Sequence, residues 1–106
     1  MTRNHDINIA RSIKVIEWLK SELLEAVSQL FRSFLHNQNE FVLQSLARLK
    51  LTIYLLGRRS GVNFERVDEQ LLILVQQYIE EGHEVEEWYG DLSLLKQYLD
   101  SRKKGP

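Results

Sequence analysis

The stretch from Asp6 to His36 reads DINIARSIKVIEWLKSELLEAVSQLFRSFLH and decides the fold class. Its apolar residues recur at steps of three, four or seven, which is the spacing of one side of an α-helix. That side holds Ile9, Ile13, Ile16, Leu23, Val27, Leu30 and Phe34, and it is widened by Leu19, Leu24, Phe31 and Leu35. No proline interrupts the stretch, so it predicts one long amphipathic helix, preceded by a flexible segment at residues 1–5.

Two further helical patterns follow, each with its own start and stop signals. The second helix is expected to begin with a capping box formed by Asn37 and Glu40 and to end near Gly61, because glycine tolerates a left-handed closing turn. Its apolar residues are Val42, Leu46, Leu49, Ile53 and Leu56. The third helix is expected to be capped by Asn63 and to end or bend at Gly82, since glycine weakens a helix interior. Its apolar residues include Phe64, Val67, Leu71, Leu74 and Tyr78.

A shorter fourth helix is expected over residues 84–99, and the pair Gly90-Asp91 can divide it because Asp91 is able to cap a new helix. The basic segment 101–106 is expected to be disordered. The sequence therefore predicts an all-α bundle of about four helices, in one domain over residues 6–100. Since the apolar faces are wider than four helices can cover, we expect a homodimer formed through the first three helices.

The composition excludes several functional classes. The 106 residues carry 14 Lys and Arg against 15 Asp and Glu, so no nucleic-acid partner is expected from overall charge. There is no cysteine, which excludes disulfides and thiolate metal sites and fits a cytoplasmic location. No apolar run approaches the roughly 20 residues of a membrane span, and the N-terminus does not resemble a signal peptide. No membrane association is expected.

The acidic pair Glu22 and Glu25 is the first candidate site. Residues three apart lie on one side of a helical turn, so the two carboxylates can share a divalent cation such as Mg²⁺, which prefers oxygen ligands. The pair is only half of a metal site, and further ligands have to come from elsewhere in the chain. The competing interpretation is that glutamate is a good helix former at exposed positions.

A C-terminal acidic cluster is the second candidate. Glu84, Glu87 and Asp91, together with Glu80, would lie on one side of an unbroken helix and could complete a metal site. Such a run of acidic residues is also typical of a solvated helix face. His83 is expected to be a turn residue.

The middle of the chain resembles the MazG superfamily of all-α nucleotide pyrophosphohydrolases. The resemblance covers about Glu17 to Leu71 and is carried by Ile53-Tyr54-Leu55-Leu56, Gly61-Val62, Phe64-Glu65 and Glu69-Gln70-Leu71. It implies a Mg²⁺ ion held by four carboxylates, hydrolysis of nucleoside triphosphates to monophosphate and pyrophosphate, and dimers or tetramers of helical subunits. Glu22 and Glu25 lie where the resemblance places the first carboxylate motif.

The second carboxylate motif of that family is missing. Its two positions hold Ala47 and Lys50, and a family lysine is replaced by Gln70. One hypothesis is that Lys50 points at Glu22 and Glu25 and replaces the ion by a salt bridge. The other is that the absent carboxylates come from the C-terminal acidic cluster.

Three further residues could bind a nucleotide. Trp18 could stack on a base, and Arg58 and Arg59 could bind phosphates, although a helix–helix boundary and a helix C-terminus are the commoner explanations of these residues. Two functional hypotheses remain open. The chain is a nucleotide pyrophosphohydrolase that uses Mg²⁺ if it is active, or it is a non-catalytic helical interaction module acting as a homodimer.

Overall fold

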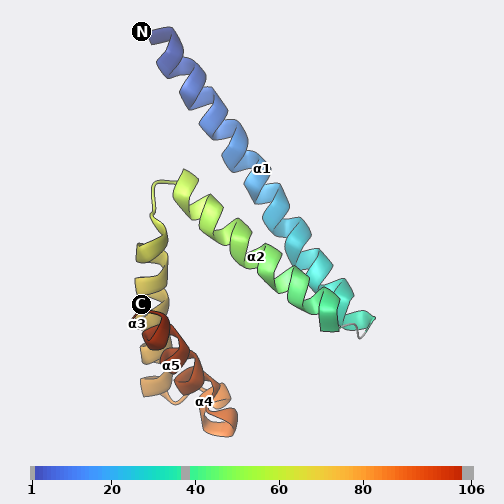
Figure 1. The fold of residues 1–106 in the computed structure, drawn as a ribbon, viewed down its shortest axis with the longest axis vertical. Coiled ribbons are helices and arrows are strands. Elements are labelled where there is room, and N and C mark those ends of the chain that lie inside the picture. The colour runs from blue at the N-terminus through green and yellow to red at the C-terminus, as the bar shows by residue number, and fades with distance from the viewer. Residues whose placement is uncertain (1, 37–38, 104–106) are drawn as a thin grey trace. The chain divides into compact units, whose positions relative to one another are not determined.

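The computed structural model describes residues 2–36 and 39–103 (Figure 1). Five α-helices and no strand occur in these residues, which confirms the all-α fold. The helices are α1 (Thr2–Leu35), α2 (Asn39–Arg59), α3 (Phe64–Glu81), α4 (Glu84–Tyr89) and α5 (Asp91–Lys103). The capping box expected at Asn37 lies outside the described residues.

The helical part is longer than expected at both ends. Helix α1 begins at Thr2 instead of near Asp6, and α5 ends at Lys103, inside the segment expected to be disordered. Met1 and residues 104–106 lie outside the described residues. No described helix has an apolar stretch long enough to cross a membrane.

The chain divides into two compact units, Met1–Phe64 and Glu65–Pro106. In the first unit, α1 and α2 pack side by side in antiparallel directions (Figure 1). Because α1 has 34 residues and α2 has 21, the N-terminal turns of α1 extend beyond α2. Ile9 and Ile13 consequently stay exposed. The single domain expected over residues 6–100 stays a prediction.

The residues buried between α1 and α2 are small, with the exception of one leucine. The buried positions of α1 are Leu19, Ala26 and Ser33, and those of α2 are Ser45 and Thr52. We call these five residues the small-residue seam. Within each helix they are seven apart, so they return to the same side after two turns. Short side chains there let the two helix axes approach closely.

The expected apolar core is therefore wrong in detail. Phe34 of the expected buried face of α1 is 59% exposed, and Ile53 of the expected face of α2 is 44% exposed. The periodicity identified the helices correctly, but apart from Leu19 the positions buried between them carry small side chains. Leu23 and Leu30 flank the seam and are half-buried.

Glycine ends α2 and α3, as expected. Gly61 has a φ of 95°, and its N–H donates to the Arg58 carbonyl while Val62 N–H donates to the Gly57 carbonyl. These two bonds form a Schellman motif, which satisfies the last carbonyls of the helix. Gly82, with a φ of 72°, ends α3 with the same pair of bonds. Helix α3 begins directly after Asn63, the expected cap position.

The second unit contains a short helix between two glycines. Gly82 precedes α4 and Gly90, with a φ of 68°, follows it, so the expected helix over residues 84–99 is divided into α4 and α5. Val75 of α3 is the buried apolar residue of this unit among the described residues.

Candidate functional site

The first functional feature is a cluster of polar side chains across the α1–α2 pair. Arg48 of α2 donates from Nη2 to Glu22 Oε2 of α1 at 2.8 Å and from Nη1 to Gln29 Oε1. The side chains of Arg48 and Glu22 are only 33% and 31% exposed, so this ion pair is partly shielded from water. One planar guanidinium thus holds two positions of the neighbouring helix.

The second carboxylate of the pair also has a guanidinium partner. Arg32 Nη2 lies 3.0 Å from Glu25 Oε1, and its Nη1 donates to Ser28 Oγ at 2.7 Å. Both members of this ion pair are 55% exposed, so it is more open to solvent than the Glu22–Arg48 pair. Each carboxylate of the expected metal motif is therefore paired with its own arginine.

The salt bridge expected between Lys50 and the α1 carboxylates is wrong. Lys50 Nζ lies over the ring of Tyr54, 5.9 Å from its centroid, and the cation on Glu22 is Arg48. The two positions differ by about 200° around a helix, because each residue adds roughly 100°. Counting from the motif placed the positive charge on the wrong side of α2.

Arg48 was not identified from the sequence as a partner of Glu22, because nothing in the apolar pattern of α2 distinguishes this residue. The available signal is its spacing from small residues: it lies three residues after Ser45 and four before Thr52, on the same side of α2. Thr52 Oγ1 donates to the Arg48 carbonyl at 2.8 Å. A sequence search that treated small residues as contact positions would have found it.

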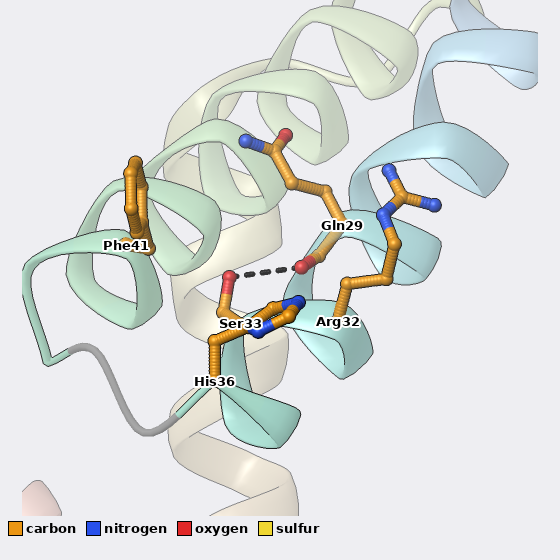
Figure 2. A pocket seen from close by; sticks show the side chains of 5 residues that line it. All are labelled: Gln29, Arg32, Ser33, His36 and Phe41. Atoms are coloured by element: carbon orange, nitrogen blue, oxygen red, sulfur yellow. Dashed lines mark hydrogen bonds between the residues drawn. The ribbon is translucent and has the colours of Figure 1, made fainter.

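An open hollow of about 150 Å³ adjoins this cluster at the turn end of the helix pair. Figure 2 shows its lining side chains: Gln29, Arg32, Ser33, His36 and Phe41. The Ser33 hydroxyl donates to the Gln29 backbone carbonyl at 2.8 Å. Gln29 contacts Arg48 and Arg32 contacts Glu25, so each of the two ion pairs has a neighbour or a member in the lining of the hollow.

The C-terminal acidic residues do not lie along one helix. Glu84 and Glu87 belong to α4, whereas Asp91 starts α5 beyond Gly90, so the unbroken helix that would align them on one face is not present. In the part of the chain that the structure describes, no three His, Asp or Glu side chains come together in a way that could hold a metal. Their part in completing a site with Glu22 and Glu25 stays a prediction.

His83 and Glu86 have clear structural roles in this segment. His83 is the N-cap of α4, as expected for a turn residue: its Nδ1 accepts from Val85 N–H at 3.1 Å. Glu86, which the sequence did not single out, accepts from Ser93 N–H at 2.9 Å and from the Ser93 hydroxyl. Hydrogen bonds from the Ser93 side chain, then from the backbone N–H groups of Ser93 and Leu92, lower the pKa of Glu86. Glu86 therefore caps α5 in the place expected for Asp91.

The expected nucleotide-binding residues are exposed. Trp18 is 59% exposed on α1, one turn before Glu22. Arg58 lies over the Phe64 ring at 5.9 Å, and Arg59 is the last residue of α2. These positions leave their binding roles as predictions.

The sequence matches the model of a known protein family. The family model described as "MazG-like family" matches residues 9–92. The chain belongs to the MazG-like family. No curated protein and no solved structure matches the chain.

The described residues of the α1–α2 pair do not fit a magnesium ion held by carboxylates. Glu22 and Glu25 are the carboxylates expected at the first motif, and Ala47 and Lys50, at the positions expected for the second motif, supply no oxygen ligand. Both retained carboxylates are already in contact with guanidinium groups. Mg²⁺ demands several oxygen ligands in octahedral geometry, and here it would have to displace two cations from only two carboxylates.

Proposed function

We propose that this MazG-like protein does not hydrolyse nucleoside triphosphates and acts as a non-catalytic helical interaction module that forms a homodimer. The observation that carries the proposal is the pairing of Glu22 with Arg48 and of Glu25 with Arg32. The chemistry that the MazG resemblance implies depends on a metal that gathers charge on the phosphate chain. The described residues of the α1–α2 pair offer only two of the four carboxylates, and both are paired with guanidinium groups.

The apolar surface supports the second part of the proposal. Leu24, Phe31 and Leu35 of α1 are 73%, 65% and 82% exposed. At about 100° per residue they lie roughly 140–180° around α1 from Ala26, on the side away from α2. Large apolar side chains aligned on one face of a helix are typical of a protein–protein contact. A second copy of the chain is the partner we propose for this face.

Pyrophosphate release tests the loss of catalysis. The purified full chain is incubated with canonical and noncanonical nucleoside triphosphates in millimolar Mg²⁺ or Mn²⁺, beside the matched variant Glu22→Gln/Glu25→Gln. We expect equal background rates from both proteins. Turnover by the unaltered chain that Glu25→Gln abolishes would show that the protein is an active pyrophosphohydrolase.

Light scattering tests the assembly. At tens of micromolar we expect twice the chain mass of 12.6 kDa. Phe31→Lys should lower the mass toward that of one chain, because it places a charge in the apolar face. Gln44→Lys, which adds the same charge at an exposed position of α2, should leave it unchanged. A single-chain mass for the unaltered protein contradicts the homodimer.

A further inference from the structure

The two ion pairs of the α1–α2 cluster differ from ordinary surface salt bridges in one respect. They engage both carboxylates of the motif that relatives would use for a metal, and each carboxylate receives one guanidinium. The four side chains Glu22, Glu25, Arg32 and Arg48 therefore sum to zero charge. A surface that would otherwise attract a divalent cation is electrically neutral.

We propose that Arg48 and Arg32 are built-in counter-cations of the Glu22–Glu25 pair, and that a divalent cation binds this pair tightly only when both arginines are removed. The proposal deepens the proposed function at the same site, because it names what keeps the metal out. It also assigns Arg48 a second task, which is to hold α2 against α1 in place of a shared ion.

The geometry favours Arg48 as the stronger of the two counter-cations. Its guanidinium is fixed at both ends of its fork, by the Glu22 carboxylate and by the neutral Gln29 amide. Both acceptors project from α1, seven residues and thus about two turns apart, so one guanidinium bridges two turns of that helix. Since Arg48 and Glu22 are about two-thirds buried, water screens their attraction less than at an open surface.

A guanidinium tethered to the adjacent helix has a kinetic and statistical advantage over a free ion. Its effective concentration is on the order of millimolar or higher, as for other groups linked within one molecule. Free Mg²⁺ must also give up tightly held water before it can bind carboxylates directly. Two carboxylates give Mg²⁺ too few ligands to compensate for its lost water and for the competition from the tethered guanidinium.

Arg32 completes the exclusion from the same helix as Glu25. It lies seven residues after Glu25, and its second nitrogen is held by Ser28. Because this pair is exposed, we expect Arg32 alone to be an incomplete barrier. Removing Arg48 alone would likewise leave Glu25 paired, so the strongest effect requires both substitutions.

Mn²⁺ binding, followed by electron paramagnetic resonance, tests the proposal on the full chain. We expect no specific binding to the unaltered protein up to about 1 mM Mn²⁺, and the same result for the control Lys50→Met. Arg32→Met/Arg48→Met should bind Mn²⁺ at least about tenfold more tightly. Adding Glu22→Gln and Glu25→Gln to that variant should abolish the gain. The proposal is overturned if the unaltered protein binds Mn²⁺ as tightly as the double variant, whether both proteins bind the ion or neither does.

A second measurement does not depend on the folding of any variant. In the unaltered protein, the side-chain Nε–H resonances of Arg32 and Arg48 should not move when Mg²⁺ is raised to 10 mM at constant ionic strength. A saturable shift of these resonances means that the ion displaces the arginines and overturns the proposal. The failure of this inference is distinct from the failure of the proposed function: metal binding without turnover contradicts only the former, and turnover independent of Glu22 and Glu25 contradicts only the latter.

Discussion

Ser33 Oγ of α1 and Ser45 Oγ of α2 lie 3.0 Å apart across the small-residue seam. Ser33 donates its single hydroxyl proton to the Gln29 carbonyl, so Ser45 is the donor in the contact between the two hydroxyls. The Ser45 side chain is fully buried. The two helices therefore meet here through a hydrogen bond between two buried side chains.

Enlarging the seam should destabilise the helix pair. Ser45→Leu forces a bulky side chain between two close helices and removes the donor to Ser33, so we expect a loss of about 1–3 kcal/mol in the free energy of unfolding. Urea denaturation measures this loss. The neighbouring exposed position provides the control, and Gln44→Leu should change the stability by less than about 0.5 kcal/mol. Equal effects of the two substitutions would contradict the close packing.

Replacing Arg48 should cost more stability than replacing Lys50. Arg48→Met leaves Glu22 without its partner in a partly shielded position, and we expect a loss of about 1–2 kcal/mol. Lys50→Met loses only an exposed contact with the Tyr54 ring and should cost no more than about 0.5–1 kcal/mol. Urea denaturation of both variants at one salt concentration decides the order. A larger loss for Lys50→Met would restore the lysine hypothesis.

The comparison of Arg48 with Lys50 shows what the sequence could and could not predict. Helix ends at Gly61 and Gly82 were predictable, because a left-handed closing turn is a local property of the backbone. The contact face was not, since serine and alanine carry no apolar signal and large residues at helical spacing drew attention away from them. The choice between Arg48 and Lys50 depends on which side of α2 faces α1, and that follows from the seam.

The capping role of Glu86 predicts a pH dependence. Hydrogen bonds from Ser93 hold the pKa of Glu86 below its ordinary value in the folded chain, so the unfolded chain binds the proton more tightly. This contribution to stability is fully present above the unfolded pKa and is lost as the pH falls through the folded pKa. Ser93→Ala should raise the pKa of Glu86, as measured by NMR titration. An unchanged midpoint in Ser93→Ala would contradict the assignment of Glu86 as the cap.

The closing turn of α2 predicts a residue-specific cost. Gly61 has a φ of 95° and open space around the position of a Cβ atom, so a substitution there is penalised by backbone conformation alone. Gly61→Ala should destabilise the protein by about 1 kcal/mol in thermal or urea unfolding. Gly61→Asn should cost less, because asparagine adopts left-handed conformations more readily than alanine. The reverse order would mean that the turn rearranges.

The hairpin formed by α1 and α2 also implies an order of events during folding. The Ser33–Ser45 contact joins residues 12 apart in the chain, whereas the Glu22–Arg48 contact joins residues 26 apart. Closing the shorter loop loses less chain entropy, so docking should start beside the turn and proceed away from it. Substitutions at Ser45 should then slow folding, and those at Arg48 should mainly accelerate unfolding. The arginine that neutralises Glu22 would thus act late, as a bond that keeps the middle of an already formed hairpin closed.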